Sequence, residues 1–206
     1  MLRIGEGAFI GSVSSLLFEG GVRGATAVAL ENVQLGVLDS QRLDAEFSSM
    51  SDQFRNLVVS LDRRLKEVTD RAVDIKLKKE MLEKYMKGKK RLIKQGNSDE
   101  RMFTITEGEA YIVRKTESGY VPLANLFKGD FFGQVPFFDI GHEPFSASVF
   151  GSDDLKVSKM DTDSLQQEYQ KLSPTFKNII EHLATCISVT TMLACDYKKK
   201  TVKKRS

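Results

Sequence analysis

An internal repeat is the strongest constraint that this sequence places on its fold. When the chain is shifted by 122 positions, residues 5–75 lie on residues 127–197 without a gap. Self-similarity at a fixed offset indicates that one structural unit is built twice. Both glycines and apolar residues coincide: Gly7, Phe9, Gly11 and Val13 fall on Gly129, Phe131, Gly133 and Val135, and Phe54, Val58, Leu61, Leu65 and Ala72 fall on Phe176, Ile180, Leu183, Ile187 and Ala194.

The second copy has upstream sequence that the first copy lacks. Residues 79–126 have no counterpart 122 positions earlier. Three explanations stay open: the gene product is shortened, its start is assigned too far downstream, or the first unit is completed from elsewhere.

Each copy predicts short strands. Residues 33–38 and 155–160 largely alternate apolar and polar side chains, which is typical of a half-buried strand. Residues 25–30 and 147–150 resemble the strand before each of them. The pattern therefore predicts an antiparallel β-structure with short strands and glycine-rich turns.

Helix start signals follow these strands. Asp39 and Asp161 stand where their side-chain oxygens can accept the free amides of a first helical turn. Upstream of the second copy, residues 91–97, 102–105 and 108–113 predict further short strands separated by turns. Several strands followed by a terminal helix predict a small β-roll capped by helix.

A heptad seam predicts a long helix over about 50–78, with its counterpart over about 174–196. Two interpretations are open: an amphipathic helix packed on its own domain, or a homodimer in which the 54–75 helix pairs with a second copy of itself. In the second copy Thr190 replaces an apolar seam residue. The seam consists of Phe54, Val58, Leu61, Leu65, Val68, Ala72 and Ile75, whereas Arg55, Asp62, Arg63, Lys66 and Glu67 lie off it and are expected to be solvated.

The net charge of +3 is unevenly distributed. Residues 1–75 carry −3, residues 76–95 carry +7, residues 96–197 carry −7 and the last nine residues carry +6. Two basic stretches thus flank an acidic body. A short basic tail such as residues 198–206 is usually solvated, so a nucleic-acid or membrane-surface role is not favoured.

The sequence indicates a cytoplasmic protein. Cys186 and Cys195 are nine residues apart and would lie on opposite faces of one helix, so they are expected to be free thiols. No apolar run reaches the roughly 18 residues of a membrane span. Gly5, Glu6 and Gly7 interrupt the apolar N-terminal stretch, which argues against a secretory signal.

Catalytic and metal sites are not expected. The two histidines, His142 and His182, are too few for the clustered ligands of a metal-dependent jelly roll. The sequence has no nucleophile elbow, no phosphate-binding loop with Gly-Lys-Ser/Thr and no zinc-like cysteine spacing.

Two segments carry a family resemblance. Residues 128–135 (Lys-Gly-Asp-Phe-Phe-Gly-Gln-Val) and 144–149 (Pro-Phe-Ser-Ala-Ser-Val) resemble the cyclic nucleotide-binding domain of catabolite-activator-type regulators and protein kinase A regulatory subunits. Residues 93–97 and 102–110 look like the first strands of that family, and residues 7–29 look like the second half of another such domain.

The resemblance covers nearly the whole chain and implies a mainly β fold with α. Each complete domain would be an eight-stranded jelly-roll barrel with a short cassette helix and long C-terminal helices. It implies an incomplete first domain over residues 1–78, including the long helix, a complete second domain over residues 79–197, and a basic tail over residues 198–206.

The family cassette has an intelligible chemistry. Its pattern is Phe-Gly-Glu, followed by an Arg with small residues after it. A short helix offers free amides to the cyclic phosphate, the Arg neutralises that phosphate, and the Glu accepts from the ribose 2′-hydroxyl. The small residues let the backbone approach the ligand.

Both copies depart from this pattern. The second has Gln134 for the Glu and Phe145 for the Arg, beside the anionic Asp139 and Glu143, so it is predicted to bind no cyclic nucleotide. The first keeps an arginine, Arg23, but has Ser12 for the Glu, and is predicted to bind weakly and in dependence on Arg23 once the missing half of its barrel is restored. The candidate ligand-binding residues are Gly11, Ser12, Arg23, Gly24, Ala25 and Thr26 in the first cassette, and Gly133, Gln134, Phe145, Ser146 and Ala147 in the second.

The expected function is non-enzymatic and regulatory. In one interpretation, a cyclic nucleotide or another phosphorylated ligand binds at Arg23 and repositions the helix from Phe54 to Ile75. In the other, both pockets are degenerate and the domains are a protein-interaction and dimerisation module. A DNA-binding regulator is disfavoured because the sequence after the last helix has no room for a helix-turn-helix.

Overall fold

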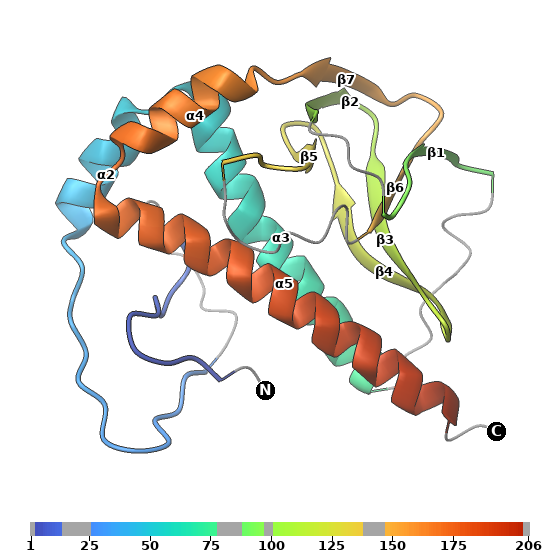
Figure 1. Ribbon diagram of the computed structural model, residues 1–206, viewed down its shortest axis with the longest axis horizontal. Coiled ribbons are helices and arrows are strands. Elements are labelled where there is room, and N and C mark those ends of the chain that lie inside the picture. Colours follow the sequence, from blue (N-terminus) through green and yellow to red (C-terminus); the bar gives the residue numbers. More distant parts are fainter. Residues whose placement is uncertain (1–2, 14–25, 78–87, 97–100, 138–146, 204–206) are drawn as a thin grey trace.

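The computed structural model describes residues 3–13, 26–77, 88–96, 101–137 and 147–203. Helices begin and end the described part, with the strands between them (Figure 1). In chain order the elements are α2 (Ser40–Ser49), α3 (Asp52–Lys76), β1 (Lys90–Ile93), β2 (Met102–Glu107), β3 (Ala110–Thr116), β4 (Gly119–Leu126), β5 (Phe131–Gly133), β6 (Ser148–Gly151), β7 (Lys156–Lys159), α4 (Thr162–Lys171) and α5 (Pro174–Lys203).

The strands form two antiparallel sheets. One has the order β1-β6-β3-β4 and the other β5-β2-β7. Ile93 pairs with Val149, which in turn pairs with Ile112, and Phe103 pairs with Phe132. The strands expected over 102–105, 147–150 and 155–160 are thus confirmed as β2, β6 and β7.

The expected barrel is not seen among the described residues, because neither sheet closes on itself. The fold is also mixed α and β rather than mainly β, since the helices contain more residues than the strands. A shared apolar core lies between the sheets. It contains Ile105 and Phe132 from one sheet and Ala110, Leu126 and Val149 from the other.

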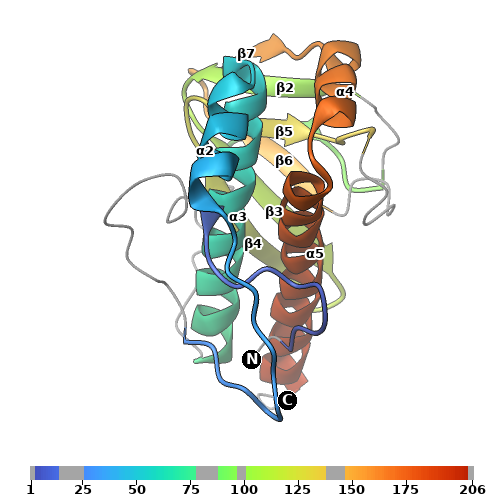
Figure 2. The same ribbon diagram turned by 90° about the vertical axis from the view of Figure 1, so that its left-hand side faces the viewer.

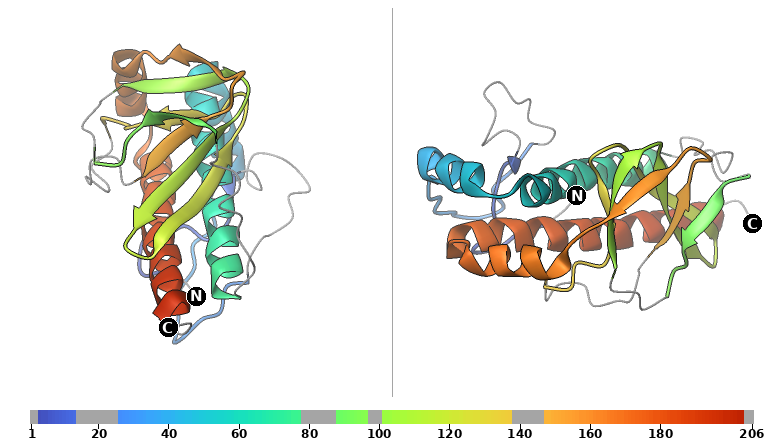
Figure 3. Two further views of the ribbon diagram at one scale, coloured as in Figure 1. Left: turned by 90° about the vertical axis from the view of Figure 1, so that its right-hand side faces the viewer. Right: turned by 90° about the horizontal axis from the view of Figure 1, so that it is seen from above.

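The helices reproduce the offset of the repeat. α4 begins and ends 122 residues after α2, and α5 begins 122 residues after α3. α3 and α5 run side by side in the same direction, with α2 and α4 at the same end (Figures 1 and 2). The two sheets lie together against one side of this helix pair (Figure 3).

Equivalent residues cap the equivalent helices. The carboxylate of Asp39 accepts from the Arg42 amide at the start of α2, and that of Asp161 accepts from the Ser164 amide at the start of α4. Both predicted caps are therefore confirmed. The hydroxyls of Ser51 and Ser173 accept from amides three residues on at the starts of α3 and α5.

The heptad seam of α3 packs inside the chain. This agrees with the first of the two interpretations of the seam, an amphipathic helix packed on its own domain. The first seam residues and their counterparts in α5 share one buried apolar cluster, which includes Phe54 with Phe176, Val58 with Ile180, and Leu61 with Leu183. The later seam residues Val68, Ala72 and Ile75 lie in a second buried cluster with Ala194 and Cys195 of α5.

Two predicted strands of the first copy are not formed. Residues 26–30 and 33–38 have no strand or helix assignment, and Val28 is 76% and Val37 100% exposed. In the second copy the equivalent strands, β6 and β7, pair with β1, β2 and β3, and the described residues of the first copy contain no equivalent of those three strands. A strand has no backbone partner without its neighbours, so an alternating pattern alone does not make a sheet.

Helix α5 also qualifies, by length and composition, as a candidate membrane span over Pro174–Thr201. This corrects the expectation that no segment approaches that length. The same helix supplies Phe176, Ile180 and Leu183 to the cluster with α3. Core helices of this kind pass the same test, so the finding is weak evidence for a membrane.

Candidate functional site

The described part of the first cassette lies against the helix pair. Val13 is fully buried in the α3–α5 cluster, and the ring of Phe9 packs on the same cluster. The Val13 amide donates to the carboxylate of Asp62 in α3 over 3.1 Å. A residue next to Ser12 is therefore tied to α3 through both apolar packing and a hydrogen bond.

The structure describes only some of the predicted ligand residues of the first cassette. Gly11 and Ser12 lie beside Val13, whereas Thr26 is exposed in an extended segment. Arg23, Gly24 and Ala25 lie outside the described residues. The structure thus places the start of this cassette against α3 and α5. The role of Arg23 in ligand binding stays a prediction.

Gly133 in the second cassette is required by the local backbone. Its φ is +119°, and an added Cβ would lie 2.3 Å from the Arg101 carbonyl oxygen and 2.8 Å from the Met102 Cα. The close approach comes from strand pairing, because Met102 of β2 lies opposite Gly133 of β5. Gln134 follows, half-buried; Phe145 and Ser146 lie outside the described residues.

The face beside Ala147 is filled by the two long helices. Ala147 packs on a buried cluster to which both helices and β4 contribute. In the family resemblance, this small residue lets the backbone approach a ligand. Here the contacts come from protein side chains: Val68, Ala72 and Ile75 of α3, Val121 and Leu123 of β4, and Ala194 and Cys195 of α5.

A polar link joins α3 to the turn before the second cassette. Asp130 is only 2% exposed in its side chain, and one carboxylate oxygen accepts from the Ser60 hydroxyl and from Arg63, both over 2.7 Å. The other oxygen accepts from the Phe127 amide over 2.9 Å. Three donors within the chain therefore stabilise this buried carboxylate, as the burial of a charge requires.

Arg64 extends the link to the first residue of β5. Its guanidinium donates to the Phe131 carbonyl oxygen and lies 4.5 Å from the centroid of the Phe131 ring. Burial lowers the pKa of Arg64 to about 10, while nearby Asp130 and Glu67 oppose that shift. The side chain therefore stays charged at neutral pH.

Glu67, one helical turn further along α3, continues the contact. Its carboxylate accepts from the Asn125 amide of β4 over 2.7 Å. Burial raises the pKa of Glu67, partly offset by this hydrogen bond. Asp62, Arg63 and Glu67 were expected to be solvated because they lie off the heptad seam. Asp62 and Glu67 are instead half-buried, whereas Arg63 pairs with Asp130 while its side chain stays 42% exposed.

The five-residue stretch 60–64 of α3 consequently touches both cassettes. Asp62 holds the backbone of the first cassette, and Ser60, Arg63 and Arg64 hold the residues before the second. Sequence reasoning missed this site. The signal available was the concentration of polar residues over 60–64 on a helix whose seam is otherwise apolar.

The described residues contain no group of three or more histidine, cysteine, aspartate or glutamate side chains that could hold a metal ion. His182 contacts the Cys186 sulfur at 3.4 Å on α5, and burial lowers its pKa. Both cysteines are free and buried, and burial raises the pKa of each thiol.

Comparison with known proteins gives one family match. The model of the cyclic nucleotide-binding domain matches residues 82–171. No curated protein matches the chain.

Solved structures similar to this chain include the cGMP-bound EAL enzyme Bd1971, at 17% identity and a TM-score of 0.44 over 57% of this chain. The match spans only 30% of that enzyme. The catabolite activator protein of Thermus thermophilus is 20% identical with a TM-score of 0.33, over 57% of this chain and 50% of that one.

The N-terminal domain of a transcriptional regulator from Streptomyces coelicolor A3(2) is 17% identical with a TM-score of 0.33, over 57% of this chain and 73% of that one. The matched segment, 82–171, contains both sheets and ends with α4. Residues 82–171 are therefore a domain of the cyclic nucleotide-binding family.

Proposed function

We propose that this chain is a non-enzymatic regulatory protein in which α3 transmits the state of the first cassette to the cyclic nucleotide-binding domain. The observation that carries the proposal is the double contact of residues 60–64. Asp62 accepts from the Val13 amide, and Arg63 pairs with Asp130 on the neighbouring turn of the second domain. Any displacement of α3 by the first cassette acts directly on the residues before β5.

The ligand in this proposal is a cyclic nucleotide or another phosphorylated molecule at the first cassette. Arg23 supplies the positive charge, and Ser12 supplies a neutral acceptor where the family has a carboxylate. Charge-assisted hydrogen bonds are roughly twice as strong as neutral ones, so binding through Ser12 is expected to be weak. Cyclic AMP and cyclic GMP are the ligands named for the bound forms of the similar EAL enzyme.

Calorimetric titration of the 206-residue chain with cyclic AMP and cyclic GMP tests the proposal. We expect weak binding that Arg23→Ala abolishes and that Arg3→Ala leaves unchanged, because Arg3 is exposed and pairs with the equally exposed Glu31. Ligand should also change the rate of amide hydrogen exchange over residues 127–137 in the parent protein. The change should be smaller in the Arg63→Met variant. Binding that survives Arg23→Ala, or exchange that ligand leaves unchanged in the parent, would refute the proposal.

A second candidate function is an interaction module that binds no nucleotide. It is favoured by the packing of Ala147 against side chains of α3 and α5. This packing supports the earlier expectation that the second cassette, with Gln134 and Phe145, does not bind cyclic nucleotide. Absence of heat with either ligand for the parent chain would favour this candidate.

The 54–75 helix, which was expected to pair with a second copy of itself, pairs here with α5 of the same chain. The seam of α3 is already covered by its repeat equivalent in α5. A homodimer through the same seam would require α5 to be replaced by the α3 of a second chain. We therefore propose that the internal helix pair takes the place of a homodimer, and that the protein acts in the cytoplasm.

A further inference from the structure

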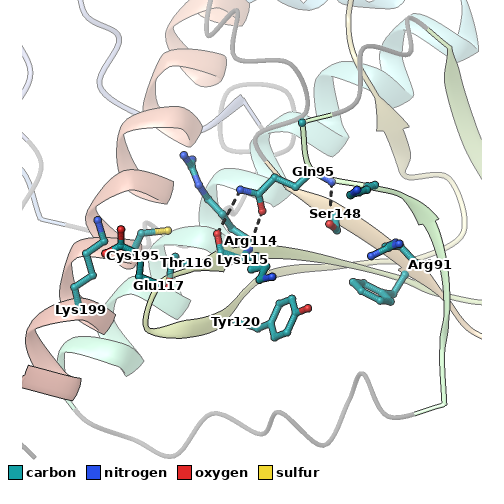
Figure 4. Close-up of a pocket in the computed structure, with 13 residues that line it drawn as sticks. Arg91, Gln95, Arg114, Lys115, Thr116, Glu117, Tyr120, Ser148, Cys195 and Lys199 are labelled. Atoms are coloured by element: carbon teal, nitrogen blue, oxygen red, sulfur yellow. Dashed lines mark hydrogen bonds between the residues drawn. The ribbon is translucent and has the colours of Figure 1, made fainter. Parts of the chain in front are cut away.

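Described residues from both basic stretches of the sequence lie at one place in the fold. Residues 76–95 carry +7 and residues 198–206 carry +6, and they lie more than 100 positions apart. Arg91 and Lys94 from the first stretch and Lys199 from the second line the same pocket, which has a volume of about 710 Å³. Figure 4 shows the α5 residues at one end of this pocket and Arg91 at the other.

The pocket lies at the end of the four-stranded sheet. There β1 ends, β6 begins and β3 turns into β4. None of the cassette residues proposed above lines it. Ser148 of the 144–149 segment lines the pocket, but the candidate ligand residues of both cassettes do not, so the inference that follows is independent of the proposed function.

Positive charge dominates the lining. Glu117 is the single carboxylate among the lining residues. A hollow lined by one sign of charge concentrates ions of the opposite sign, because the protein around it screens poorly. The cationic residues come from β1, the loop after it, β3 and α5: Arg91, Lys94, Arg114, Lys115 and Lys199.

A glutamine holds the walls of the pocket together. The Gln95 side chain donates to the Lys115 carbonyl oxygen over 3.3 Å and accepts from the Lys115 amide over 2.8 Å. Its own amide donates to the Ser148 hydroxyl over 3.0 Å. These three bonds fix the loop carrying Lys94 against β3 and β6 (Figure 4). Because the loop is already ordered, a ligand would lose less free energy to ordering it on binding.

The rest of the lining is aromatic or apolar. Tyr120 of β4 and Phe150 of β6 each offer a ring, and Cys195 adds a weakly polar surface. An aromatic base can stack on such rings while its phosphates face cations. The volume is within the range of small-molecule sites.

We propose that this pocket binds a nucleotide carrying two or more phosphates, with its phosphates at the cations and its base against the aromatic rings. The charge of the lining separates this ligand from a cyclic nucleotide. A cyclic nucleotide has one singly charged phosphate, whereas five cations and one carboxylate line the pocket. A nucleoside triphosphate carries more negative charge and can therefore pair with more of the five cations than a cyclic nucleotide can.

Calorimetric titration of the full chain with ATP and GTP tests the assignment, with cyclic AMP, inorganic triphosphate and a single-stranded oligonucleotide as comparisons. We expect a nucleoside triphosphate to bind best. Loss of two charge-assisted contacts in the Arg91→Glu, Lys199→Glu variant should weaken it at least about 100-fold. Lys171→Glu, an exposed lysine on α4 outside the pocket, is the matched control and should bind like the parent.

A second variant tests the aromatic part. Tyr120→Ala should weaken the nucleoside triphosphate about tenfold and leave inorganic triphosphate unchanged, because stacking serves only the base. Circular dichroism melting checks that every variant is folded; since Arg91 and Lys199 are exposed, their replacement should not unfold the chain.

Several results would overturn the proposal. One is binding of cyclic AMP that is tighter than that of the nucleoside triphosphate and that the double variant abolishes, since this would place the cyclic nucleotide in the pocket. The others are equal binding of inorganic triphosphate, tighter binding of the oligonucleotide, or nucleoside triphosphate binding that the double variant retains. Loss of nucleoside triphosphate binding with retained Arg23-dependent cyclic nucleotide binding would support two separate sites.

Discussion

Ser51 donates both its backbone amide and its hydroxyl to the carboxylate of Glu168, over 2.6 and 2.7 Å. The same pair recurs with the copies exchanged, since Ser173 donates its amide and hydroxyl to Glu46 over 2.6 and 2.7 Å. Ser173 lies 122 residues after Ser51, and Glu168 lies 122 residues after Glu46. Reciprocal contacts of this kind characterise a twofold interface, which here lies within one chain.

The reciprocal pairs predict matched energetic effects. Ser51→Ala and Ser173→Ala each remove a helix cap and a hydrogen bond to a carboxylate, so each should lower the free energy of unfolding by about 1–2 kcal/mol. Urea denaturation followed by circular dichroism measures this. Ser158→Ala, at an exposed strand position, is the control and should change little. A loss in one serine variant only would show that the two contacts are not equivalent in solution.

The buried carboxylate of Asp130 should be costly to remove. Asp130→Asn leaves Arg63 and the Ser60 hydroxyl facing a neutral group, and we expect a loss of about 3 kcal/mol in the free energy of unfolding. Arg63→Met should cost less, about 1 kcal/mol, because the arginine side chain is 42% exposed. The exposed Asp153→Asn provides the control in the same denaturation experiment. Equal stabilities of the Asp130 and Asp153 variants would contradict the link.

Alanine substitutions at Gly133 and Gly129 distinguish the cost of a steric clash from the cost of an unfavourable backbone conformation. Both have φ in the left-handed region, but only Gly133 would place a Cβ against the Arg101 carbonyl oxygen. Gly129→Ala should cost about 1 kcal/mol from conformation alone, and Gly133→Ala at least about 3 kcal/mol. Thermal melting of both variants gives the comparison. If Gly129→Ala were the less stable protein, the strand β5 would not approach β2 as described.

The pH dependence of stability should report on Glu67. Burial raises its folded-state pKa above the unfolded value of 4.5, so the folded state holds this proton more tightly. The stabilisation is complete below the unfolded pKa and is lost as pH rises through the raised folded pKa. Relative to the parent, Glu67→Gln should therefore gain stability between pH 4 and pH 7. Urea midpoints measured at several pH values test this, and a difference between the two proteins that is constant with pH would contradict it.

The occupied seam predicts a monomer. Leu61 is 4% exposed and shares its cluster with Leu183, so Leu61→Ala should lower the free energy of unfolding by about 3 kcal/mol. Leu77→Ala, where the leucine is 61% exposed, should lower it much less. Sedimentation at tens of micromolar should show the parent and both variants as monomers. A dimeric parent that Leu61→Ala converts into a folded monomer would contradict the internal pairing.

Periodicity and capping predicted the elements whose partners lie in this chain. The caps at Asp39 and Asp161 depend on one side chain and a local amide, and both are formed. The strands β2, β6 and β7 were also recognisable because each has a neighbouring strand within residues 88–159. These elements could be predicted from the sequence because the groups they pair with lie nearby in the same copy.

The sequence was a poorer guide where a partner decides the outcome. Residues 33–38 have the same alternation as β7, but among the described residues no strand pairs with them. Arg63 and Glu67 follow the polar pattern of a solvated helix face, yet they meet Asp130 and Asn125 on the second domain. A polar residue bound to a distant backbone cannot be distinguished from a solvated one by its spacing.

The buried seam position 190 has a consequence for how this protein can evolve. Val68 of α3 corresponds to Thr190 of α5, and both side chains are buried. In a homodimer one codon specifies both sides of such an interface, so every substitution appears twice. Here two codons specify them, and each side can acquire a mutation that the other does not share. The two sides of this internal helix pair can therefore diverge in sequence, as Val68 and Thr190 already do.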